Sequence, residues 1–233
     1  MRIISGDLKG QKISLPRDSN TRPLKDLVKE SIFNIINHSN KFSVSIEGST
    51  ILDLFSGVGS FGIEALSRKA KDVTFVEYYP KVLQILEANI DKFKLRDKCK
   101  ILKTDIFEDK LYEELKKEFN LIFIDAPFKE KRIDLIINNI KKNNLLKKGG
   151  IIILHRQVSL EDNFGTAFNV IEYKKYGISK IIFGARDLKT GFCGSCEDLS
   201  KNLCFNHTPN ITGGVLEKDC SLILKKFFKD KRN

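Results

Sequence analysis

A nearly continuous apolar run that ends in a glycine-rich loop constrains the fold of this chain more than any other feature. The run Thr50–Leu54 leads into Gly57, Gly59 and Gly62, whose GxGxxG spacing is typical of the turn between a buried strand and a nucleotide-binding helix. Glu77 stands 20 residues after Gly57, where a carboxylate can accept from ribose hydroxyls. The spacing predicts a nucleotide site; a glycine turn that only lets a helix approach the sheet is the alternative.

Short β-rich runs alternate with helical stretches through residues 48–184. After Thr50–Leu54, the predicted strands are Val73–Glu77, Lys100–Leu102, Leu121–Asp125 and Gly150–His155, and the predicted helices are Gly62–Arg68, Pro80–Phe93, Asp109–Phe119 and Ile133–Asn143. The last two β-like runs, Phe168–Tyr173 and Ile178–Phe183, lie too close in sequence for a crossover and predict a hairpin. The chain is therefore expected to be an α/β protein with a Rossmann-like fold, whose mostly parallel sheet ends in an antiparallel hairpin.

Three segments differ in composition. Residues 1–47 carry basic turns and a predicted helix, Asp26–Asn37, and are interpreted as an N-terminal extension. Residues 48–184 form the predicted domain. Residues 185–233 hold four of the five Cys and a basic end, and are interpreted as a tail or small appended module.

The net charge limits the possible partners. Lys and Arg number 41 against 30 Asp and Glu, a formal charge of +11, which favours nucleic acid or an acidic membrane surface; a generally Lys-rich proteome is the alternative. The excess is concentrated at the ends, since residues 1–50 hold eight basic and five acidic residues and residues 201–233 hold seven and three. This distribution favours RNA over a membrane.

No apolar run approaches the roughly 18 residues of a membrane span, and the N-terminus lacks an apolar signal core. Five Cys in 233 residues do not make a disulfide scaffold. The chain is therefore expected to be cytoplasmic, with reduced thiols, and a monomer that does not associate with membranes.

Asp53 indicates which nucleotide the glycine loop binds. It stands four residues before Gly57, where a fixed negative charge would repel a dinucleotide pyrophosphate but suit the ammonium and sulfonium of S-adenosylmethionine. Asp105 follows the third predicted strand and could accept from the adenine amine. One acid near each of the first three strand ends is a methyltransferase-like arrangement. A nucleotide-dependent oxidoreductase remains an alternative, which the glycine spacing supports and Asp53 opposes.

The fourth predicted strand ends in Asp125, Ala126, Pro127 and Phe128. The exocyclic amine of a base is a poor nucleophile because its lone pair is delocalised into the ring. The Asp125 carboxylate and the Ala126 carbonyl could hold the amine hydrogens out of the ring plane, while an extruded base stacks on Phe128. Alignment and electrostatic support would then supply most of the rate. An ordinary strand-end turn is the alternative.

The sequence gives less support to other kinds of catalytic chemistry. No Pro is followed by Cys, which excludes a Pro-Cys nucleophile, and no P-loop motif is present. The three His, at positions 38, 155 and 207, form no protease or hydrolase pattern. His155, at the end of the fifth predicted strand, is interpreted as a core or strand-end histidine, with a pocket residue as the alternative.

With these motifs in place, the chain resembles the RsmD-type bacterial 16S ribosomal RNA guanine-N2 methyltransferases over about residues 1–184. The resemblance rests on six segments: RIISG (2–6), KG (9–10), TRP (21–23), KESIFN (29–34), DLFSGVGSFGIEALSR (53–68) and DAPF (125–128). The glycine loop alone is shared with most S-adenosylmethionine enzymes, whereas its combination with the N-terminal segments is much more specific.

The resemblance implies methyl transfer from S-adenosylmethionine to the N2 amine of a guanine in 16S rRNA of the small ribosomal subunit. It adds Phe55 to the donor site and assigns residues 125–128 to the amine site. It also implies RNA binding by the basic N-terminal segment, with Arg2, Lys9, Lys12 and Arg22 as candidates; an ordinary solvated face is the alternative. Two further functions stay open: an adenine-N6 methyltransferase on DNA or RNA, and a non-catalytic RNA-binding ribosome-assembly protein.

The chain departs from the family pattern in two places. Ala126 stands where the family usually has Pro, which releases a backbone restraint, and the chain continues for 49 residues beyond Gly184. This tail contains Cys193, Cys196, Cys204 and His207, a spacing compatible with a zinc site. An unliganded tail is preferred to zinc, and a redox pair is the third interpretation.

Overall fold

A seven-stranded sheet with the order β3-β2-β1-β4-β5-β7-β6 organises the chain. The computed structural model describes residues 1–16, 24–39, 41, 43–160, 168–176 and 179–185. The strands are β1 Thr50–Leu54, β2 Asp72–Val76, β3 Cys99–Leu102, β4 Phe119–Ile124, β5 Leu146–Gln157, β6 Asn169–Tyr176 and β7 Ser179–Ala185. β1 to β5 pair in parallel, whereas β7 pairs antiparallel with both β5 and β6. The predicted mostly parallel sheet with a terminal hairpin is confirmed.

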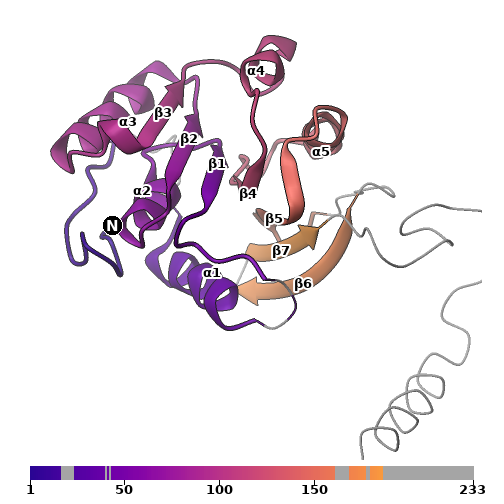
Figure 1. The fold of residues 1–233 in the computed structure, drawn as a ribbon, viewed down its shortest axis with the longest axis horizontal. Helices are drawn as coiled ribbons and strands as arrows, with labels where there is room; N and C mark the ends of the chain where they lie inside the picture. The colour runs from indigo at the N-terminus through magenta and orange to yellow at the C-terminus, as the bar shows by residue number, and fades with distance from the viewer. Residues whose placement is uncertain (17–23, 40, 42, 161–167, 177–178, 186–233) are drawn as a thin grey trace, which may run out of the picture. The chain divides into compact units, whose positions relative to one another are not determined.

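Helices cover both faces of this sheet. They are α1 Asp26–His38, α2 Ser60–Ser67, α3 Pro80–Lys92, α4 Asp109–Glu114 and α5 Ile133–Lys142, with a short 3₁₀ turn at Arg96–Lys98. α1, α2 and α3 contribute to one apolar cluster and α4 and α5 to the other, and Figure 1 shows the two groups on opposite faces. Because both faces are covered, β1 is buried along its whole length, as its continuous apolar sequence predicts.

Two predicted boundaries differ from the structure by four residues or more. The predicted helix Asp109–Phe119 ends at Glu114, and Phe119 is instead the fully buried first residue of β4. The aromatic side chain gains more from burial between the sheet and its helices than from a position at a helix end. β5 begins at Leu146, earlier than predicted, because this residue pairs with Phe119 across a register shift in the two strands.

The N-terminal segment belongs to the same core as the sheet. Ile3 and Ile13 are buried in the cluster of α1, α2 and α3, and Met1–Asp187 forms one compact unit. The Lys29 side chain donates to the Arg2 carbonyl at 2.9 Å and lies 3.4 Å from Glu64. Glu64 in turn accepts from the backbone amides of residues 4 and 5 at 2.7 and 3.0 Å. The N-terminal segment is therefore fixed to α2, the helix that follows the glycine loop.

Candidate active site

Four titratable side chains reach the same face at the carboxyl ends of neighbouring strands. Side chains alternate between the two faces of a strand, and Ile51, Phe75, Phe123 and Ile153 all lie in the cluster covered by α1, α2 and α3. Two residues further along each strand come Asp53, Glu77, Asp125 and His155. The pairing of β2, β1, β4 and β5 therefore assembles three carboxylates and an imidazole at one edge of the sheet.

The glycine loop needs its glycines for two different reasons. Gly57 and Gly59 have φ of 55° and 83°, in the left-handed region that side chains disfavour. Gly62 lies in α2, where a Cβ would come within 2.3 Å of the Phe75 ring. Phe55 also has a positive φ, 57°, at the point where the chain leaves β1. The loop is thus a tight turn that brings the start of α2 close to the sheet.

Two polar side chains hold this loop in place. Glu77 accepts from the Gly57 amide at 2.9 Å and from the amides of Tyr78 and Tyr79 at 3.0 Å. Asn89 of α3, which is fully buried, donates to the carbonyls of Val58 at 3.1 Å and residue 14 at 3.2 Å. Asn89 therefore joins the loop to the N-terminal segment, a role that the sequence did not reveal.

Asp53 is the most deeply buried acid of the group, with 1% of its surface exposed. Its Oδ2 accepts from the Gly62 amide at 3.1 Å, an otherwise unpaired donor in the first turn of α2. Burial raises the pKa of Asp53 well above its ordinary value; the Gly62 hydrogen bond opposes this shift, and the charges of Asp125 and Glu77 add to it. A ligand with a positive group would relieve the repulsion among these carboxylates, so this edge fits a cationic ligand.

Asp105 lies beside an aromatic wall at the same end of the sheet. Its Oδ1 accepts from the Phe107 amide at 3.1 Å. The ring of Phe107 meets that of Phe55 edge-to-face, with 6.4 Å between centroids, and the Arg132 guanidinium lies 3.5 Å from the Phe107 centroid. This wall joins the segments that follow β1, β3 and β4, and its apolar rings and carboxylate are suited to a planar base with an amine.

The loop after β4 presents the other predicted group. Asp125 follows β4 with 21% of its side chain exposed, and its Oδ1 lies 2.7 Å from Nδ1 of His155. Ala126 is almost fully buried, Pro127 is exposed and Phe128 is half-buried. Within the described part of the chain, no hydrogen bond engages Asp125 Oδ2 or the Ala126 carbonyl. Two acceptors are therefore available at this point.

β5 supplies two residues whose roles the sequence did not reveal. His155 is buried and contacts Asp125, as the alternative interpretation of a pocket residue allowed. Arg156, with 2% exposure, donates to the carbonyls of Pro127 at 3.2 Å and Glu130 at 2.8 Å. A histidine and an arginine at the end of an apolar strand are the signal, because buried polar groups need partners.

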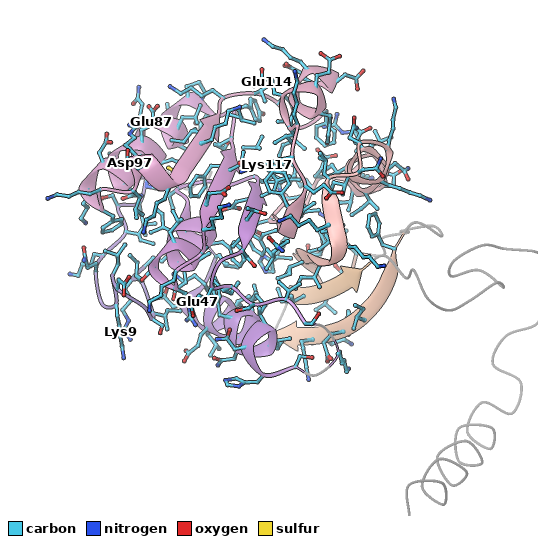
Figure 2. All side chains as sticks on the ribbon, in the orientation of Figure 1. Lys9, Glu47, Glu87, Asp97, Glu114 and Lys117 are labelled. Carbon is cyan, nitrogen blue, oxygen red and sulfur yellow. The ribbon has the colours of Figure 1, made fainter. Side chains whose placement is uncertain are left out.

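The remaining predicted residues belong to the N-terminal segment or lie outside the described residues. The side chains of Arg2, Lys9 and Lys12 are exposed on the N-terminal segment, and Figure 2 shows Lys9 pointing outward at the periphery. Arg22 and the four zinc candidates, Cys193, Cys196, Cys204 and His207, fall outside the described residues. The described residues contain no metal-binding group of His, Cys, Asp or Glu and no helix that could cross a membrane.

Known proteins are similar in sequence to this chain over most of its length. The family model "Conserved hypothetical protein 95" matches residues 1–185. YlbH from Bacillus subtilis, described as a candidate rRNA methyltransferase, is 35% identical over 169 residues, which cover 71% of this chain and 88% of YlbH. Ribosomal RNA small subunit methyltransferase D from Haemophilus influenzae is 32% identical over 162 residues, 67% of this chain and 79% of the relative. The chain belongs to the RsmD-type family.

Solved structures share the fold of this chain. The protein yhhF from Escherichia coli, described as a candidate methyltransferase, superposes with a TM-score of 0.64 at 26% identity, covering 79% of this chain and 96% of yhhF. SMU.776, described as a candidate methyltransferase and solved in complex with SAH, superposes with a TM-score of 0.52 at 15% identity, over 67% of this chain and 48% of that protein; this likeness shows the fold alone. The predicted Rossmann-like methyltransferase fold is confirmed.

Proposed function

We propose that this chain transfers a methyl group from S-adenosylmethionine to the N2 amine of a guanine in 16S rRNA. Membership of the RsmD-type family supports this function, and so do relatives named as methyltransferases of small-subunit rRNA. The observation that carries the proposal is a pair of acceptors, Asp125 Oδ2 and the Ala126 carbonyl, that no described residue engages, beside a second group of carboxylates.

The two acceptors match the chemistry of an amine with two hydrogens. Hydrogen bonds from both hydrogens would draw them out of the plane of the base, so that the nitrogen lone pair is no longer delocalised into the ring. Phe128, half-buried beside Asp125, offers a ring against which an extruded base can stack. The chain's part in the transfer is therefore to hold and orient the amine, without a covalent intermediate.

The residues around the glycine loop would hold the methyl donor. S-adenosylmethionine supplies an electrophilic methyl group on a positively charged sulfur. Asp53, Phe55, Gly57, Gly59, Glu77 and Asp105 are the residues proposed to bind it. Glu77 has lone pairs left beyond its bonds to the loop amides, so ribose hydroxyls can still donate to it. The negative charge of this edge would favour the cationic donor over its neutral-sulfur product.

The basic N-terminal segment is proposed to contact the RNA backbone. Arg2, Lys9 and Lys12 are exposed, and residues 1–29 hold seven basic and three acidic residues. Their charge would attract phosphates without reading the base, while the carboxylate edge receives the extruded nucleotide. Arg22 completes the proposed set, and a small ribosomal subunit is the proposed partner.

Transfer to an isolated subunit tests this function. The full-length chain is incubated with methyl-labelled S-adenosylmethionine and small subunits from a bacterial strain without an RsmD-type enzyme, and the labelled nucleotide is mapped. We expect label on the N2 amine of one guanine in 16S rRNA. Label on adenine N6 would favour an adenine methyltransferase, and donor binding with no transfer would favour a non-catalytic assembly protein.

A further inference from the structure

His155 is a shared neighbour of the two groups proposed to hold the base. Its Nδ1 lies 2.7 Å from Oδ1 of Asp125, and its ring meets that of Phe128 edge-to-face with 5.8 Å between centroids. Leu154 pairs with Ile124 across β4 and β5, so His155 stands next to Asp125 in the sheet. One side chain on a central strand therefore contacts both the amine acceptor and the stacking ring.

The hydrogen bond to His155 gives the two oxygens of the Asp125 carboxylate different roles. A carboxylate can only accept, so the shared proton is carried by Nδ1 of the imidazole. Oδ1 is engaged by this bond, and Oδ2 is left as the oxygen that can accept from a substrate. Without His155, the carboxylate could rotate about its Cβ–Cγ bond and present either oxygen in many orientations.

The other ring nitrogen argues against a purely structural role. His155 is 6% exposed, and its Nε2 is buried with no hydrogen-bond partner in the part of the chain that the structure describes. A buried polar atom without a partner costs free energy. An apolar side chain at this position would avoid that cost, and Asp125, with 21% exposure, could turn to water. The fold therefore has little need of a histidine here.

We propose that His155 is a positioning residue for methyl transfer, which fixes the Asp125 carboxylate and the Phe128 ring relative to each other. The inference rests on the proposed function of Asp125 and goes beyond it, because it assigns the orientation of the acceptor to a residue on a different strand. His155 acts through Asp125 and Phe128, so its loss lowers the rate of the chemical step and leaves donor binding unchanged.

Three substitutions at one position test the inference in the full-length chain. His155→Leu removes the donor, and we expect the maximal transfer rate to fall by up to about 100-fold, with the dissociation constant for S-adenosylmethionine within about twofold of the wild type. His155→Asn keeps an N–H at the δ position and should recover most of the rate. His155→Gln places its amide one bond further from the backbone and should recover little. His38→Leu, at the exposed end of α1, is the matched control.

The outcomes separate a positioning role from a structural one. An unchanged transfer rate in His155→Leu overturns the inference. Equal transfer rates in the Asn and Gln variants also overturn it, and this comparison can be made even if the Leu variant does not fold. Parallel losses of rate, donor affinity and thermal stability in all three would indicate a merely structural histidine. A wild-type chain that binds the donor but transfers nothing would overturn the proposed function itself, and the inference with it.

Discussion

The three carboxylates at the edge of the sheet have different surroundings and therefore different capacities. Asp53 is buried and bonded to the first turn of α2. Glu77 supports the glycine loop through three backbone amides. Asp125 is partly exposed and keeps one oxygen free of internal bonds in the described structure. Residues of one chemical type are thus suited to different tasks because of the groups around them.

The raised pKa of Asp53 makes the stability of the ligand-free chain depend on pH. In the folded chain, the Asp53 carboxyl group keeps its proton at pH values above its ordinary pKa of 3.8. Its contribution to the free energy of unfolding is therefore present at low pH and is lost as the pH rises through the raised pKa. Asp53→Asn should therefore make the chain more stable than the wild type at neutral pH.

Thermal unfolding of both proteins from pH 4 to pH 9 measures this difference. The two curves should converge at acid pH and diverge as the pH rises, and donor affinity should be weaker in the Asn variant. Curves that stay parallel across the range would contradict the account of Asp53.

Arg156 holds the loop that follows β4. Ala126 lacks the backbone restraint of a proline, but the guanidinium of Arg156 holds the carbonyls of Pro127 and Glu130. We expect Arg156→Met to lower the free energy of unfolding by about 1.5–3 kcal/mol, because the hydrogen bonds donated by a buried charged side chain are lost, and to lower the transfer rate.

The matched control for Arg156→Met is Arg132→Met, on the loop that Arg156 contacts. Arg132 is exposed and bonded to the Glu130 carboxylate, whose pKa it lowers to about 2. Chemical denaturation should show little change for this variant, because exposed ion pairs add little to stability. Equal losses of unfolding free energy in the two variants would show that the hydrogen bonds of Arg156 do not stabilise the loop more than an exposed ion pair does.

α2 connects the glycine loop to the N-terminal segment. It begins after Gly59, and near its end the Ser67 hydroxyl donates to the carbonyl of residue 5 at 2.6 Å. Glu64, fully buried in the middle of α2, accepts from that segment and pairs with Lys29 of α1 and Arg68. The position of the loop therefore depends on the packing of residues 1–8.

The Glu64 cluster predicts a large effect of a small substitution. Glu64→Gln removes the buried carboxylate beside the Lys29 ammonium and leaves only the partly exposed Asp26, 3.9 Å away. Removing one partner of a buried ion pair costs about 3–5 kcal/mol. Glu30→Gln, on the exposed face of α1, is the control and should change the free energy of unfolding little. Urea denaturation of both variants checks this; similar midpoints would contradict a structural role of Glu64.

The elements could be predicted where one local pattern governs them. The apolar run of β1, the glycine spacing and the proline that begins α3 each specify a boundary, and β1 and the start of α3 are as predicted. The end of α4 was mispredicted because Phe119 has a suitable helical spacing and joins β4 only through tertiary burial.

The candidate site was predictable for the acids and not for their partners. Asp53, Glu77 and Asp125 each stand at the end of an apolar run that predicts a strand. The carboxyl ends of parallel strands meet at one edge of a sheet, so the sequence alone predicts that these acids lie together. His155 and Arg156 act through the pairing of β4 with β5, a register that no local pattern specifies. Asn89 likewise reaches the loop only through the packing of α3.

The chain as a whole is basic, although three acidic side chains gather at one edge of its sheet. The net charge is +11, whereas the carboxyl ends of β1, β2 and β4 bring together Asp53, Glu77 and Asp125. A basic chain suits a polyanion as one ligand, and the acidic edge suits a cationic donor as the other. The two ligands should therefore respond differently to salt.

Salt titrations measure this difference. RNA affinity should fall steeply with salt, while affinity for S-adenosylmethionine changes little. Replacing Arg2, Lys9 and Lys12 by Gln should reduce the slope of log affinity against log salt by about 1 for each side chain that contacts a phosphate. The control triple consists of three exposed lysines in or near α4 and α5, Lys116, Lys141 and Lys142. Equal slopes for the two triples would contradict RNA binding by the N-terminal segment.

The central claim is that one edge of the sheet holds two separable sites, one for the donor and one for the amine. Asp125→Ala tests it most directly, with the transfer rate and the dissociation constant for S-adenosylmethionine measured on the same full-length preparation. We predict the loss of most methyl transfer to the small subunit, with donor affinity largely unchanged. An equal loss of both, or a transfer rate that does not fall, would contradict the account.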